Sequence, residues 1–98
     1  MSLGIYRYEF DAKVPVEDVQ SSLVLALIGT ESLHGETASQ LGVSHLFDAD
    51  RRTCIVDVDN PVGSDFNSLF AGFLRREFGP DAFQVRRVSE SPADAAAA

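Results

Sequence analysis

The sequence is short of cysteine and of basic residues, and each shortage excludes a class of function. The one cysteine, Cys54, cannot form a disulfide within the chain, which favours a reducing, cytoplasmic compartment. Eight Lys and Arg residues stand against 15 Asp and Glu residues, for a formal net charge of −7. Because nucleic acids and anionic membrane surfaces are negatively charged, neither is expected as a partner.

Long apolar runs are also missing. The longest, residues 23–28, is too short to span a bilayer, and no basic and apolar leader pattern occurs near the start, so we expect a cytoplasmic protein. The 98 residues, 45% hydrophobic and 23% charged, are typical of one soluble domain. We place a single α+β domain at residues 1–88, followed by a disordered Ser/Pro/Ala-rich tail at residues 89–98.

The motifs of common enzyme classes are absent as well. The sequence has no Gly-x-x-x-x-Gly-Lys loop, no His-Glu-x-x-His helix and no Gly-x-Ser-x-Gly elbow. A single cysteine also excludes the Cys-x-x-Cys pair of metal-transfer domains. We therefore expect no cofactor and no catalytic residue, and enzymatic activity is not favoured.

Two elements are predicted in the first third of the chain. From Ile5 to Ala12 the residues alternate, with the aromatic side chains on one face, which is typical of a half-buried strand. Pro15 then begins a helix that Gly35 ends. Its inward stripe comprises Val16, Val19, Leu23, Ala26, Leu27, Thr30 and Leu33. Three further apolar residues, Val24, Leu25 and Ile28, widen the stripe beyond the needs of one sheet face, so we expect part of the helix to meet a partner.

The middle of the chain predicts a hairpin. Residues 38–47 alternate, and a second alternating run at residues 53–59 follows a turn. If Asp48 pairs with Arg51 across that turn, the apolar side chains of both strands share one face. The facing pairs in this register are Leu41 with Val58, Val43 with Val56, and His45 with Cys54.

A second helix and a last strand complete the pattern. The helix is predicted from Ser64, as its N-cap, to Phe78, with Gly79 and Pro80 as the stop, and Phe83 begins the strand. The order strand, helix, strand, strand, helix, strand resembles the ferredoxin-like split βαβ arrangement. The resemblance implies an α+β fold, a four-stranded antiparallel sheet of order 4-1-3-2, and two helices on one face.

The predicted open face of the sheet is charged and of mixed sign. It presents Arg7, Glu9, Asp11, Asp57, Asp59 and Arg86. An RNA-recognition module of this shape would carry aromatic side chains there to stack on bases. Here Tyr6, Tyr8 and Phe10 are predicted on the opposite face, which again argues against nucleic-acid binding.

The acidic stretch CIVDVDNPVGSDF, residues 54–66, does not match a calcium-binding EF-hand loop. Counting from Asp57, the sixth position is Val62, where the sharp turn needs glycine, and the twelfth is Ser68, where a bidentate Glu is required. We interpret residues 61–63 as a turn and Asp65 as a carboxylate in the first turn of the following helix.

Several weaker sites remain as hypotheses. The topology brings four candidate ligand-binding residues to one end of the sheet: His34, Glu36, Asp57 and Asp59. His45 beside Cys54 resembles a base next to a nucleophile, although both are predicted to face inward. The doublets at 75–76 and 86–87 are interpreted as solvated arginines. Gly72, in the middle of the second helix, indicates either that another segment approaches the helix backbone or that a poor helix former is simply tolerated.

The expected function is that of a non-catalytic binding or protein-interaction module, either a homo-oligomer or a subunit of an assembly. The alternative is a small enzyme or a ligand-binding or divalent-cation-binding domain, with its site at the end of the sheet that carries His34, Glu36, Asp57 and Asp59. The sequence identifies no small-molecule ligand and no metal centre.

Overall fold

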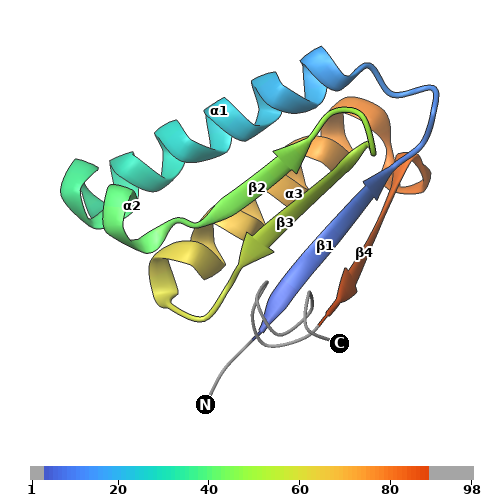
Figure 1. The fold of residues 1–98 in the computed structure, drawn as a ribbon. Helices are drawn as coiled ribbons and strands as arrows, with labels where there is room; N and C mark the ends of the chain where they lie inside the picture. Colours follow the sequence, from blue (N-terminus) through green and yellow to red (C-terminus); the bar gives the residue numbers. More distant parts are fainter. Residues whose placement is uncertain (1–3, 89–98) are drawn as a thin grey trace.

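A computed structural model describes residues 4–88 of the chain. The predicted tail, residues 89–98, lies outside these described residues. The elements follow one another as β1 (Ile5–Phe10), α1 (Val16–His34), α2 (Glu36–Gly42), β2 (His45–Asp48), β3 (Thr53–Asp57), α3 (Pro61–Phe78), a short 3-10 helix (Pro80–Ala82) and β4 (Phe83–Arg87) (Figure 1).

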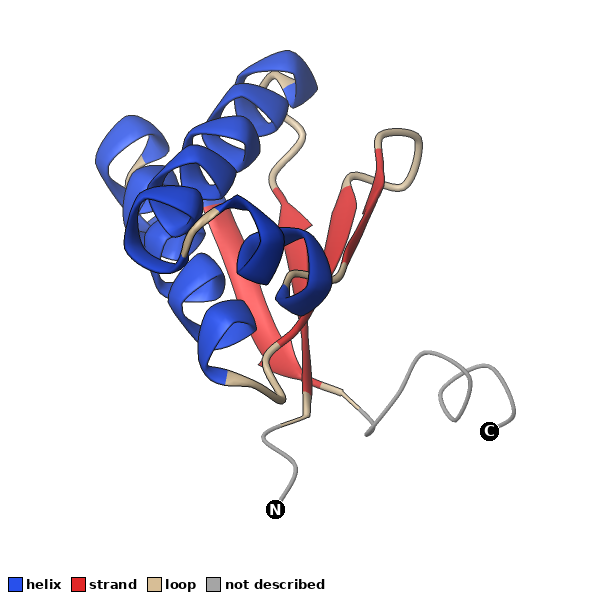
Figure 2. Ribbon diagram, turned by 90° about the vertical axis from the view of Figure 1, so that its left-hand side faces the viewer, coloured by secondary structure: helices blue, strands red, loops and turns tan. Residues whose placement is uncertain are grey.

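The four strands form one antiparallel sheet of order β2-β3-β1-β4. This is the predicted order read from the opposite edge, so the α+β class and the strand order are confirmed. The helices lie together on one face of the sheet, and no described helix covers the other face (Figure 2). In place of the two predicted helices, α1, α2 and α3 occupy the covered face.

The core lies between the sheet and the helices, and aromatic rings fill its centre. Tyr8 and Phe10 point from β1 toward α3 and are 0% and 7% exposed, so the predicted inner face of this strand is confirmed. From α3, Phe66 and Phe70 are both fully buried. The rings of Tyr8 and Phe70 lie 5.0 Å apart between centroids, and each such aromatic pair adds about 0.5–1.5 kcal/mol beyond its buried area.

The predicted strand at residues 38–47 is wrong over its first half, where the chain forms α2 and leaves β2 only four residues long. The alternation that indicated a strand rested partly on Leu41, whose side chain is 84% exposed. Gly42, the last residue of α2, fits tightly against α3: a Cβ atom added there would lie 2.7 Å from the Cβ of Val62. The segment thus packs against α3 as a helix, despite the weak local strand pattern.

The predicted hairpin register is wrong by two residues. His45 pairs with Val56 and Phe47 pairs with Cys54, so the predicted pairing of His45 with Cys54 does not occur. A shift of two leaves every side chain on its predicted face, because side chains alternate with a period of two. The turn is longer than predicted, since it extends through Arg52, a non-glycine residue at φ 57.

Arg52 ties this turn to the loop that follows β1. Its backbone oxygen accepts a hydrogen bond from the Phe10 N–H at 3.0 Å. Its guanidinium donates to the backbone oxygens of Asp11, at 2.8 Å, and of Val14. Two loops that are about forty residues apart in the sequence are therefore joined through one side chain.

The long helices end where predicted, but α3 begins earlier. Gly35 and Gly79 follow α1 and α3 with φ of 88 and 90, a conformation that favours glycine. The N-cap of α3 is Asn60, not Ser64: its side-chain oxygen accepts a hydrogen bond from the Gly63 N–H at 2.8 Å. Residues 61–63 therefore form the first helical turn rather than a separate turn, and Asp65 lies beyond that first turn.

Candidate functional site

The acidic loop after β3 holds the backbone together through its carboxylates. An Asp57 oxygen accepts a hydrogen bond from the Asp59 N–H at 2.9 Å, which is a local Asx turn. An Asp59 oxygen accepts one from the Gly4 N–H at 2.7 Å and so ties the start of β1 to this loop. The Asn60 amide donates to the Gly42 backbone oxygen at 3.0 Å. These contacts give each polar side chain a structural role.

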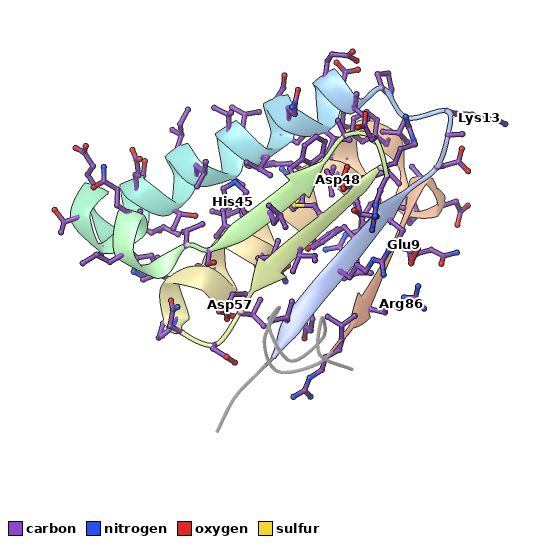
Figure 3. The ribbon with its side chains drawn as sticks, in the orientation of Figure 1. Glu9, Lys13, His45, Asp48, Asp57 and Arg86 are labelled. Carbon is purple, nitrogen blue, oxygen red and sulfur yellow. The ribbon has the colours of Figure 1, made fainter. Side chains whose placement is uncertain are left out.

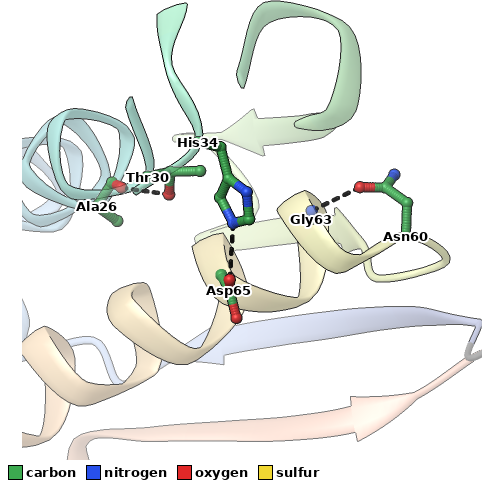
Figure 4. A network of polar contacts seen from close by, with 6 residues as sticks. All are labelled: Ala26, Thr30, His34, Asn60, Gly63 and Asp65. Carbon is green, nitrogen blue, oxygen red and sulfur yellow. Dashed lines mark hydrogen bonds and ion pairs between the residues drawn. The ribbon is translucent and has the colours of Figure 1, made fainter. Parts of the chain in front are cut away.

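The other two candidate ligand-binding residues also have their own contacts. His34, at the end of α1, lies with Nε2 2.7 Å from an Asp65 oxygen on α3 (Figure 4). Glu36, on α2, accepts a hydrogen bond from Gln40 at 3.4 Å. Within residues 4–88, no three His, Cys, Asp or Glu side chains form a group that could hold a metal ion. Ligand binding by the four residues stays a prediction, and His34 contacts Asp65 rather than the other three.

The structure does not bring His45 and Cys54 together as base and nucleophile. The register places Phe47, not His45, opposite Cys54, and His45 lies beside the Phe66 ring with 5.6 Å between centroids. Cys54 is 0% exposed, and burial raises the pKa of its thiol to about 12. Partial burial lowers the pKa of His45. A thiol held in its neutral form is a poor nucleophile at neutral pH.

Cys54 should therefore react with a thiol reagent such as Ellman's reagent only when the protein unfolds. In native protein at pH 7.5 we expect the labelling rate to follow global unfolding, and in urea we expect a rapid, stoichiometric reaction whose rate depends only on the reagent concentration. Stopped-flow absorbance measures both rates. Rapid labelling of the native protein, rising with pH around neutrality, would contradict the burial of this thiol.

The open face of the sheet is charged, as predicted. Arg86 on β4 forms an ion pair with Glu9 on β1, with 2.6 Å between Nη2 and Oε1, and the two side chains lie close together in Figure 3.

Two further sequence hypotheses concern α3. Arg75 and Arg76 lie in the last turn of this helix, where cations are favoured. A Cβ atom added at Gly72 would meet nothing within 4 Å. Within residues 4–88 no segment approaches the helix there, which leaves simple tolerance of a poor helix former as the interpretation of Gly72 inside this chain.

A hollow of about 410 Å³ lies at the opposite end of the sheet from the acidic loop. It is formed by the loop after β1 and the segment between α3 and β4, with Val14, Phe78 and Ala82 as apolar walls and Asp11, Lys13 and Asp81 as charged lining. Lys13 and Asp57 are labelled at opposite ends of the molecule in Figure 3. Sequence reasoning missed this hollow, although the predicted topology does bring these two loops to the same end.

The outward side of α1 carries an apolar surface. Val24, Leu25 and Ile28 are 52%, 53% and 54% exposed, in the middle of the longest helix described. We call the exposed residues Gln20, Ser21, Val24, Leu25, Ile28 and Ser32 the α1 outer face. The predicted excess of apolar side chains on this helix is therefore confirmed as exposed surface.

The inward side of α1 is fixed by its packing, so the outer face cannot turn toward the core. Val19, Leu23 and Ala26 are buried against the sheet and α3. Thr30 is buried too, and its hydroxyl donates to the Ala26 backbone oxygen at 2.7 Å (Figure 4). Leu33, predicted on the inward stripe, is 65% exposed near the end of the helix. The helix thus has apolar residues on both sides.

The α1 outer face also lacks charge. Residues 19–30 contain no Asp, Glu, Lys, Arg or His, whereas Asp18 and Glu31 flank the segment. A helix on the surface of a soluble protein usually carries charged and polar residues on its solvent side. This side of α1 therefore differs from the usual solvent side of a surface helix.

Comparison of the sequence with models of known protein families and with curated proteins gives no match. None of the helices within residues 4–88 contains an apolar stretch that could span a bilayer.

Proposed function

We propose that this protein is a non-catalytic binding module that associates with another protein surface through the α1 outer face. The observation that carries the proposal is the exposure of Val24, Leu25 and Ile28 on an uncharged segment of a helix whose other side is already packed. Contiguous exposed apolar surface of this kind typically marks a site of protein association.

The energetics of association favour this assignment. Full burial of one Val, Leu or Ile side chain is worth about 1.5–3 kcal/mol, so burying the exposed half of three such side chains would contribute about 1 kcal/mol each. A partner that covers this face gains that free energy without reorganising the helix, because α1 is held by the core on its inward side.

The positions of the chemically reactive residues support a binding role over catalysis. Cys54 is buried with a raised pKa, and strand register places His45 opposite Val56 instead of the thiol. The carboxylates of Asp57 and Asp59 accept hydrogen bonds from backbone N–H groups. Packing or hydrogen bonding within the fold therefore explains the position of each of these residues.

We also assign the fold to the ferredoxin-like arrangement, with α2 as an additional helix between α1 and β2. The order of elements and the order of strands support this assignment. Many unrelated functions occur on this arrangement, so the proposed function rests on the surface of α1 and not on the fold. A cytoplasmic location is proposed from the single, buried cysteine.

A matched pair of variants tests the proposed function. Leu25→Glu places a charge on the α1 outer face, while Leu46→Glu places the same charge on β2, where the leucine is 64% exposed. We expect Leu25→Glu to weaken association with a protein partner at least about tenfold and Leu46→Glu to leave it unchanged. Affinity chromatography from source-cell extract, followed by binding measurements with each purified partner, compares the two.

Survival of binding in the Leu25→Glu variant would oppose the proposal. If every partner and every self-association survives Leu25→Glu, the α1 outer face has no binding role. Circular dichroism of both variants confirms that each is folded, which is expected because both leucines are more than half exposed.

A further inference from the structure

We propose that the partner of the α1 outer face is a second copy of this chain, with the two α1 helices antiparallel about a two-fold axis. This inference rests on the proposed function and specifies its partner.

The outward residues of α1 have the spacing of a two-helix seam. Glu17, Ser21, Val24, Ile28 and Glu31 are all exposed and follow one another at intervals of four, three, four and three residues. This alternation is the a and d pattern of helices that pack side by side. Leu25 lies next to the seam and adds apolar area. The seam is apolar at its centre and acidic at its ends.

The charges on the seam select the antiparallel orientation. Parallel pairing of two copies in register would place Glu17 against Glu17 and Glu31 against Glu31, and like charges at such positions are destabilising. In this spacing Ser21 and Ile28 are a positions, and Val24 and Glu31 are d positions. Antiparallel pairing places the a positions of one helix opposite the d positions of the other. Val24 then meets Ile28 of the second copy, and Glu31 meets Ser21 of the second copy, so no carboxylate faces another carboxylate.

Two further properties of this arrangement favour a second copy. The helix dipoles oppose each other in an antiparallel pair, which is favourable. An isologous two-fold interface must be complementary to itself, and this face meets that requirement. The register that pairs Val24 with Ile28 of the second copy also places Gln20 opposite Ser32, a neutral polar pair at the margin. The same patch therefore serves both copies.

The size of the surface predicts a weak dimer. A helix of 19 residues is about 28 Å long at 1.5 Å per residue. Its outward side offers less than the roughly 800 Å² per partner of a standard stable interface. We therefore expect a dissociation constant in the micromolar range or weaker. The charge of −7 on each copy opposes association at low salt, so added salt should strengthen the dimer.

Analytical ultracentrifugation of the full chain tests the dimer. We expect the wild-type protein to shift from monomer toward dimer as its concentration rises, and to shift further in high salt. Ile28→Glu should weaken dimerisation at least about tenfold, while Leu46→Glu should leave it as in wild type. A wild-type protein that stays monomeric up to millimolar concentration at both salt levels would overturn the inference.

Disulfide trapping tests the orientation. In the antiparallel pair, a chain carrying Val24→Cys should form a disulfide with a chain carrying Ile28→Cys faster than either forms one with itself. Native Cys54 is fully buried and does not compete. Preferential trapping of like with like would instead indicate the parallel pair and overturn the proposed geometry.

The results also separate this inference from the proposed function. If the chain is monomeric, yet Leu25→Glu abolishes binding to a different purified protein, the binding role of the α1 outer face stands and pairing with a second copy is wrong. If the chain is monomeric and Leu25→Glu changes no interaction, both proposals are wrong.

Discussion

Replacing Gly63 with alanine should destabilise the protein by about 3 kcal/mol, the upper end of the usual cost of overpacking. The added Cβ atom would lie 2.5 Å from the Asp57 backbone oxygen and 3.3 Å from the Gly42 backbone oxygen. Because both obstacles are backbone, relief requires moving α3 away from β3 and α2. That movement would also strain the N-cap bond from the Gly63 N–H to Asn60.

Gly72→Ala is the matched control in the same helix. Apart from the surrounding turns of α3 itself, no atom of residues 4–88 lies within 4 Å of the Cβ position there, so alanine should stabilise α3 by up to about 1 kcal/mol through its higher helix propensity. Chemical denaturation of both variants, compared at equal m-values, measures the two changes in the free energy of unfolding. If Gly63→Ala destabilises the protein no more than Gly72→Ala does, the close approach at Gly63 is wrong.

Replacing Phe70 with alanine should have an effect of similar or greater size. Its ring is 0% exposed and lies 5.0 Å from Tyr8 and 6.0 Å from Phe66 between centroids. Removing a ring from such a site costs about 3–5 kcal/mol. Since small domains are stable by only about 5–15 kcal/mol, the variant should be marginally folded at 37 °C, which thermal unfolding followed by circular dichroism would measure.

Phe73→Ala is the comparison for this prediction. Phe73 lies one turn further along α3 and is only partly buried at the margin of the core. Its loss should cost clearly less, because part of the ring is already in water. Equal destabilisation by the two substitutions would mean that Phe70 does not occupy the centre of the core.

Much of the fold follows from features that depend on few residues. Tyr8 and Phe10 alternate with charged residues, and any sheet that buries one side of β1 must bury them. Gly35 and Gly79 end their helices because their φ values favour glycine. These features are local, or depend only on which face is apolar, and the predictions drawn from them are confirmed.

The errors arise where a distant contact decides the local structure. The segment that includes Leu41 is compatible with strand or with helix by its local pattern, and in the structure it is a helix whose Gly42 packs against Val62 on α3. The hairpin register depends on the conformation of Arg52, whose guanidinium contacts lie in another loop. Asn60 and Ser64 are both suitable N-caps by residue type, and the position of Gly63 against β3 favours the first.

The same distinction applies to the candidate site. That Asp59 binds the Gly4 N–H, and that His34 contacts Asp65, depends on three-dimensional proximity that the sequence does not record. The α1 outer face could be predicted, because counting apolar residues against the width of one packed stripe requires no knowledge of other elements.

The contacts of Arg52 have a consequence for how this end of the molecule responds to its surroundings. Three hydrogen bonds of Arg52, one to its backbone oxygen and two from its guanidinium, join the β2–β3 turn to the end of β1 and the loop after it. The two loops should therefore detach together or not at all. The loop after β1 is also one wall of the neighbouring hollow, so a substitution that breaks the Arg52 contacts should loosen that wall as well.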